Sequence, residues 1–85
     1  MEIEFDPAKD TENVRKHGIS LQRADEFVSV ADYQDGRFDY GETRYRAYGH
    51  IDDVAYCLVF TVRGESIRAI SLRRALAKEM KRYAA

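Results

Sequence analysis

The spacing of apolar residues divides the chain into an opening part with helical features and a later part with the period of β-strands. From Glu42 onward, apolar and polar residues alternate, which predicts strands over Thr43–His50, Val54–Arg63 and Glu65–Arg73. The turns between these segments are short, so the strands should be antiparallel neighbours. Val54–Arg63 is apolar on both faces, which predicts a place in the middle of the sheet.

The opening residues predict one short strand followed by a surface helix. Ile3 and Phe5 alternate with glutamates, as expected of a strand with one buried face. Asp6 has the right chemistry for an N-cap, and the helix is predicted over Pro7–His17. Gly18 should end this helix in the left-handed conformation.

Two more helices and a turn-prone segment complete the pattern. Ser20 is suited to cap a helix over about Leu21–Ser29. The acidic segment Ala31–Gly41 contains an Asp-Gly turn signal and fits either a short edge hairpin or a mobile loop. A last helix is predicted from Arg74 to about Ala84.

The predicted order is therefore β-α-α-β-β-β-α. This order indicates an α+β fold with a curved antiparallel sheet and helices packed against it. The chain has 85 residues, of which 45% are hydrophobic. Residues 1–85 should form a single domain with a thin core.

The charge is unevenly distributed along the chain. The formal net charge is −1, but residues 1–53 hold 7 Lys/Arg and 13 Asp/Glu, a balance of −6. Residues 54–85 hold 7 Lys/Arg and 2 Asp/Glu, a balance of +5. This asymmetry predicts a side that faces a polyanion and a separate acidic side.

Cysteine and histidine usage argues against redox and metal chemistry. Cys57 is the one cysteine and lies in the most apolar run, so a small buried hydrophobe is expected rather than a nucleophile. His17 and His50 are isolated in the sequence, and no Cys/His cluster has metal-ligand spacing. The longest apolar run, Val54–Val62, is too short to span a bilayer, and the acidic N-terminus predicts no signal peptide. A cytoplasmic protein without membrane contact is expected.

A strand that leads directly into a helix carries most of the basic residues of the last third. Within Ser66–Tyr83, Arg73 and Arg74 lie at the predicted joint, with Arg68 upstream and Lys78 downstream. The guanidinium group is a planar fork of donors that matches phosphate oxygens. The joint therefore fits a phosphate-binding site, and it also fits a solvated helix face that is basic.

Several segments together resemble the BrnT family of type II toxins. They are Phe5–Lys9, Asn13–Ser20 (NVRKHGIS), Glu42–Arg44 and Ile67–Ala75 (IRAISLRRA), with Glu79 and Tyr83 following. Their order and separation match the family over nearly the whole chain.

This resemblance implies a RelE-like fold and an mRNA-cleaving endoribonuclease toxin that inhibits translation. It implies a BrnA-like antitoxin with a ribbon-helix-helix DNA-binding domain, and operator DNA would be bound only through that antitoxin. No cofactor or metal is expected.

RNA cleavage without a metal requires a base for the 2′-hydroxyl, an acid for the 5′-oxygen, cations at the phosphorus and correct alignment. The candidates for catalysis are His17, Lys16, Arg44, Arg73, Arg74 and Tyr83. The candidates for substrate binding are Arg68, Lys78, Glu42 and Glu79.

Each candidate also has a structural interpretation. The unperturbed imidazole of a histidine suits proton transfer near neutrality, which favours a catalytic His17, yet a cation at a helix C-terminus is also favoured by the dipole. Glu42 can act as a base or can orient an arginine. Arg73 and Arg74 are adjacent, so they should point in different directions and at most one should be catalytic. Tyr83 can stack on a base, donate a proton or close the core.

Two other functions fit the same residues. The chain can be an inactive toxin-like module that binds a ribbon-helix-helix repressor, for which the acidic segment Asp32–Asp39 would be a docking surface. It can also be an RNA-binding domain that uses the basic helix and exposed tyrosines.

Overall fold

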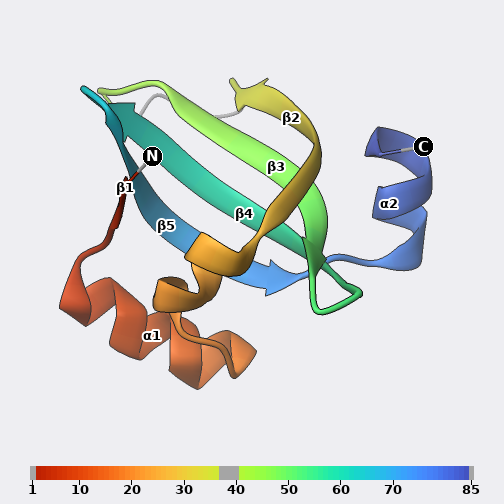
Figure 1. The fold of residues 1–85 in the computed structure, drawn as a ribbon, viewed down its shortest axis with the longest axis horizontal. Helices are drawn as coiled ribbons and strands as arrows, with labels where there is room; N and C mark the ends of the chain where they lie inside the picture. The colour runs from red at the N-terminus through yellow and green to blue at the C-terminus, as the bar shows by residue number, and fades with distance from the viewer. Residues whose placement is uncertain (1, 37–40, 85) are drawn as a thin grey trace.

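The computed structural model describes residues 2–36 and 41–84. Its elements in chain order are β1 (Glu2–Glu4), α1 (Pro7–His17), the 3₁₀ helix η1 (Leu21–Glu26), β2 (Val28–Asp35), β3 (Arg44–Ile51), β4 (Val54–Arg63), β5 (Ser66–Arg74) and α2 (Ala77–Tyr83). The strands form one curved sheet in the order β1-β5-β4-β3-β2 (Figure 1). The α+β class and the central position of β4 are thus confirmed.

The sheet is antiparallel except at one edge. β2, β3, β4 and β5 pair as antiparallel neighbours, whereas β1 runs parallel to the first residues of β5. β1 can be parallel because α1 and the rest of the chain lie between it and β5 in the sequence, which leaves ample length for a crossover.

The predicted second helix is wrong beyond Glu26. Leu21–Glu26 forms a 3₁₀ helix, and the chain then becomes the edge strand β2. β2 crosses close over β3 at Gly49, where a Cβ atom would lie 2.1 Å from the carbonyl oxygen of Val28. The absence of a Cβ atom at Gly49 therefore permits β2 and β3 to pair this closely. The helical spacing of apolar residues within Leu21–Ser29 carries no information about this tertiary contact. Of the predicted turn-prone segment Ala31–Gly41, residues 37–40 lie outside the described part.

The observed order is consequently β-α-β-β-β-β-α, with a 3₁₀ helix in place of the second α-helix. The last helix is also shorter than predicted, because Arg74 still pairs with Tyr56 in the sheet. α2 begins only at Ala77, where the Glu79 carboxylate accepts a hydrogen bond from the Leu76 N–H. The first helix has the predicted bounds, with Asp6 as N-cap.

The main core lies on the sheet face that α1 and η1 cover (Figure 1). Its buried members are Ile19, Leu21, Ala24, Ile51, Leu58, Ala69 and Leu72. α2 contacts residues that alternate with core residues along β3 and β5, so it packs on the opposite face. In the described residues, no helix is long and apolar enough to cross a membrane.

Asn13 joins α1 to the sheet and is buried. Its amide nitrogen donates to the carbonyl oxygens of Leu72 and Ile19, both at 2.9 Å, and its Oδ1 accepts from the Leu72 N–H at 3.0 Å. β1 pairs only with residues 66–68 of β5, so Asn13 takes the place of a strand residue farther along this edge.

Asp10 makes a second connection from the same helix. Its carboxylate accepts hydrogen bonds from the Ser20 hydroxyl and from the Leu21 N–H. Ser20 in turn accepts from the Gln22 N–H. These hydrogen bonds hold the start of η1 against α1. Asp10 and Ser20 therefore have a structural role.

We expect Asn13→Ala to lower the free energy of unfolding by about 2–4 kcal/mol, because three buried backbone groups would lose their partner. Urea unfolding followed by circular dichroism measures this change. Thr11→Ala, an exposed position on the same helix, is the matched control and should change stability by less than about 0.5 kcal/mol. Equal stability of the two variants would contradict this role for Asn13.

Candidate functional site

A cavity of about 420 Å³ lies between the sheet and α2 and is rich in basic side chains. It is lined by Arg46, Arg73, Lys78, Glu79, Arg82 and Tyr83. β3 contributes the first residue, β5 the second and α2 the other four. Four cationic groups face one carboxylate here, so the cavity is suited to an anion.

An ion pair between Arg73 and Glu79 links the end of β5 to α2. The two guanidinium nitrogens donate to the two carboxylate oxygens at 2.8 and 2.9 Å, a bidentate arrangement. The Arg73 hydrogen bonds, joined by that from the Leu76 N–H, lower the pKa of Glu79 to about 2. The same pairing raises the pKa of Arg73. Glu79 is therefore a carboxylate at neutral pH and cannot donate a proton.

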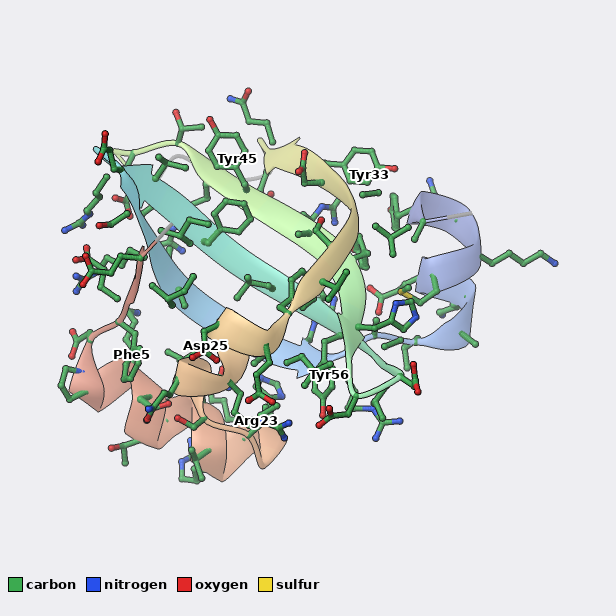
Figure 2. All side chains as sticks on the ribbon, in the orientation of Figure 1. Phe5, Arg23, Asp25, Tyr33, Tyr45 and Tyr56 are labelled. Atoms are coloured by element: carbon green, nitrogen blue, oxygen red, sulfur yellow. The ribbon has the colours of Figure 1, made fainter. Side chains whose placement is uncertain are left out.

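Tyr83 is the aromatic centre of the site. Its ring stacks on that of Tyr48, with centroids 5.1 Å apart and planes 11° from parallel. The guanidinium carbons of Arg46 and Arg82 lie 4.9 and 5.3 Å from the centre of the Tyr83 ring. Tyr33 packs edge-on at 5.7 Å, and its hydroxyl donates to the Tyr83 carbonyl. Figure 2 shows the Tyr33 side chain between β2 and α2.

Two buried polar side chains of the sheet, Tyr48 and its strand partner Cys57, lie beneath Tyr83. Tyr48 is fully buried, and its hydroxyl has no hydrogen-bond partner in the part of the chain that the structure describes. Burial raises the pKa of Tyr48, and it also raises the pKa of the neighbouring Cys57 thiol. Cys57 is thus buried and protonated, as expected of a structural cysteine.

Of the ten residues proposed from the sequence, the cavity brings four together. They are Arg73, Lys78, Glu79 and Tyr83. Arg74 lies on the opposite face, with its guanidinium 6.0 Å from the centre of the Tyr56 ring. The two adjacent arginines therefore point in different directions, as predicted.

Three other candidates lie elsewhere in ion pairs. Arg68 is 3.7 Å from Glu4 of the neighbouring strand. Glu42 is 3.8 Å from Arg44 and 3.6 Å from Arg63, so it orients arginines rather than facing the cavity. Arg44 is two residues before Arg46 on β3, so both side chains lie on the sheet face that α2 covers.

His17 and Lys16 line a separate cleft beside α1. This cleft measures about 230 Å³ and includes Lys9 and Ser71. Lys16 is 3.5 Å from Glu12 within the helix, and His17 is exposed at the helix end. His17 therefore does not line the arginine cavity.

Sequence reasoning missed the contributions of four residues, which are Arg46, Arg82, Tyr48 and Tyr33. Tyr48 follows Arg44 and Arg46 at strand spacing, and this period was the available signal. Tyr33 gave no such signal, because its strand β2 forms only through pairing with β3. Among the described residues, no group of three or more His, Cys, Asp or Glu side chains could hold a metal ion.

The comparisons with known proteins point to one family. A family model described as the ribonuclease toxin BrnT of type II toxin–antitoxin systems matches residues 5–79. This match confirms the resemblance inferred from the sequence motifs. Searches of curated proteins and of solved structures gave no match.

We expect Glu79→Gln to lower the free energy of unfolding at neutral pH by roughly 1.5–3 kcal/mol, the usual value of a hydrogen bond to a charged group. Because folding lowers the pKa of Glu79 from 4.5 to about 2, this stabilisation is complete above the unfolded-state pKa and is lost as pH falls through the folded-state pKa. Parent and variant should therefore have similar melting temperatures near pH 2. Thermal unfolding between pH 2 and pH 7 tests this.

Glu12→Gln is the control for this experiment, since the Glu12–Arg15 pair is exposed on α1. It should change the melting temperature little at any pH. A difference between Glu79→Gln and the parent that does not vary with pH would contradict the ion-pair interpretation.

Proposed function

Because this chain belongs to the BrnT family of ribonuclease toxins of type II toxin–antitoxin systems, we propose that it is an endoribonuclease that cleaves RNA at the cavity beside α2. Family membership implies an antitoxin partner and an RNA substrate. The observation that supports this location is the convergence of four cations and of Tyr83, which is stacked on the buried Tyr48, in one cavity.

The reaction that suits these groups is internal transfer of the phosphodiester. The 2′-hydroxyl loses its proton and its oxygen bonds to the adjacent phosphorus, while the bond to the 5′-oxygen breaks and that oxygen gains a proton. The products are a 2′,3′-cyclic phosphate and a free 5′-hydroxyl. Negative charge builds up on the phosphoryl oxygens, and Arg46, Lys78 and Arg82 are placed to stabilise it.

Arg73 has a different task in this proposal. Its bidentate bond to Glu79 holds the guanidinium in one orientation at the cavity wall. A side chain held in this way stabilises the transition state without a further loss of rotamer freedom. Arg74, on the opposite face, is not part of the reacting site.

Tyr83 is assigned to base stacking, and its hydroxyl is the candidate proton carrier. One face of its ring rests on Tyr48, which holds the ring in place. Stacking on an aromatic side chain contributes about 1–3 kcal/mol per base. His17 and Lys16, in the cleft beside α1, would contact phosphates away from the reacting one, and Arg44 and Arg68 would extend the basic surface.

Other details follow the family resemblance. We propose a RelE-like arrangement of the sheet, action in the cytoplasm without a metal, and neutralisation by a BrnA-like antitoxin. That antitoxin would carry a ribbon-helix-helix domain and would bring the complex to operator DNA. An inactive module that binds such a repressor remains the second candidate, because the described cavity contains no histidine to carry protons.

We expect Arg73→Ala to reduce RNA cleavage by about 10²-fold, the usual effect of removing one group that stabilises transition-state charge. Arg74→Ala, at the adjacent position, should cleave nearly as fast as the parent. The assays are cleavage of a labelled RNA by purified protein and growth arrest on expression of the chain alone. Glu79→Gln keeps the cation while breaking the ion pair, so it separates loss of charge from loss of structure.

The outcomes distinguish the candidate functions. Folded parent protein that binds RNA or the repressor without cleaving RNA, and without arresting growth, would support the inactive module. Equal rates of RNA cleavage by Arg73→Ala and Arg74→Ala would contradict the proposal that the active site lies in this cavity.

We expect two substitutions of Tyr83 to separate stacking by its ring from proton transfer by its hydroxyl. Tyr83→Phe retains the stacking surface, so RNA affinity should stay close to that of the parent. Tyr83→Ala should weaken RNA binding by about 5- to 100-fold, which corresponds to the stacking energy of one base. Fluorescence anisotropy with a short labelled RNA measures both. Slow cleavage by Tyr83→Phe with unchanged affinity would identify the hydroxyl as the proton carrier.

A further inference from the structure

A second cavity, of about 330 Å³, opens on the sheet face opposite the basic one. Its lining comes from all five strands, from η1 and from Phe27 between η1 and β2. The lining is mostly apolar. We call it the acidic-rimmed groove, because its two charged residues are both aspartates.

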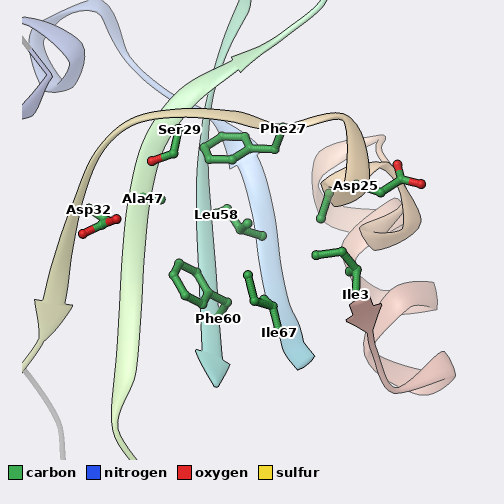
Figure 3. A pocket seen from close by; sticks show the side chains of 10 residues that line it. Ile3, Asp25, Phe27, Ser29, Asp32, Ala47, Leu58, Phe60 and Ile67 are labelled. Carbon is green, nitrogen blue, oxygen red and sulfur yellow. The ribbon is translucent and has the colours of Figure 1, made fainter. Parts of the chain in front are cut away.

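Figure 3 shows these carboxylates on either side of an apolar floor. Asp32 projects from β2 and Asp25 from η1, while Leu58, Phe60 and Ile67 lie between them. Both aspartates are exposed, and neither forms an ion pair within residues 2–36 and 41–84. By contrast, Glu26 next to Asp25 is paired with Arg23.

The groove combines an apolar floor with charge at its rim. A surface of this kind, apolar and rimmed by charge, is typical of a protein–protein contact. RNA does not fit it, because the phosphate backbone would be repelled by the carboxylates.

We propose that the acidic-rimmed groove binds the antitoxin, through a segment that presents apolar side chains flanked by lysine or arginine. This inference rests on the proposed function, since a toxin requires a protein that neutralises it. The charge of the groove favours a basic segment, and the apolar floor supplies the buried area.

The groove is separated from the basic cavity by a single strand. Asp32 faces the groove, and the next residue, Tyr33, faces the opposite side and contacts Tyr83. An antitoxin anchored in the groove therefore needs only to cross the edge strand β2 to reach α2. The anchor and the inhibited site are different surfaces, so substitutions should affect them independently.

The test uses the product of the neighbouring reading frame, co-expressed and purified with this chain, as the antitoxin. In the double variant Asp25→Lys/Asp32→Lys, its affinity for the purified toxin should fall at least 10-fold, and binding should become less sensitive to salt. The control Glu2→Lys/Glu65→Lys makes the same charge change at exposed positions that do not line the groove. It should bind nearly as well as the parent.

RNA cleavage is measured for each variant as well, so that antitoxin binding in the groove is tested separately from the proposed ribonuclease activity. Unchanged cleavage with lost antitoxin binding supports the groove as the anchor. If the parent does not cleave RNA but antitoxin binding still depends on Asp25 and Asp32, the proposed function fails and the docking surface stands. An equal loss of antitoxin affinity in the double variant and in the control would overturn the assignment of the groove as the antitoxin anchor.

Two further results would also overturn it. Antitoxin binding that depends on Arg46 and Arg73 but not on the two aspartates would place the anchor in the basic cavity. A parent chain that is dimeric in sedimentation, and that Asp25→Lys/Asp32→Lys makes monomeric, would show that the groove binds a second copy of this chain.

Discussion

The amide of Asn13 is the contact on which the arrangement of this domain depends. It completes the open edge of β5 and holds the loop after α1 at the same time. Because a buried backbone group without a partner costs about 1–3 kcal/mol, this one side chain decides where α1 lies. With α1 in place, Asp10 holds η1, and η1 directs the chain into β2. The positions of the hydrophobic core and of the acidic-rimmed groove both follow from this series of contacts.

Because side chains alternate along a strand, the apolar and the basic residues lie on opposite faces of the sheet. Neighbouring residues such as Leu72 and Arg73, or Ala47 and Tyr48, point to opposite sides. One face is buried beneath α1 and η1 and ends in the acidic-rimmed groove, whereas the other carries the arginines and α2. In a chain of only 85 residues, a polyanion and a protein partner can thus be bound a single strand apart.

α2 is short, and its position depends on polar and aromatic contacts more than on apolar burial. No residue of this helix is fully buried. The Arg73–Glu79 pair attaches its first turn, and Tyr83 attaches its last turn to Tyr48 and Tyr33. Three of the residues that hold α2, namely Arg73, Glu79 and Tyr83, also line the basic cavity. Binding of an anion there is therefore expected to be coupled to the stability of the helix.

The sequence by itself determined the class of fold, the bounds of α1, the central strand and the opposite directions of Arg73 and Arg74. These features follow from local periodicity and capping, which act over a few residues. Only the tertiary structure decided that Phe27 leads into an edge strand, that His17 is apart from Arg73, and that Tyr33 meets Tyr83. Each of these depends on the close crossing of β2 over Gly49 or on the packing of α1 against β5. Contacts between residues distant in the chain leave no period in either segment, so no single stretch of sequence records them.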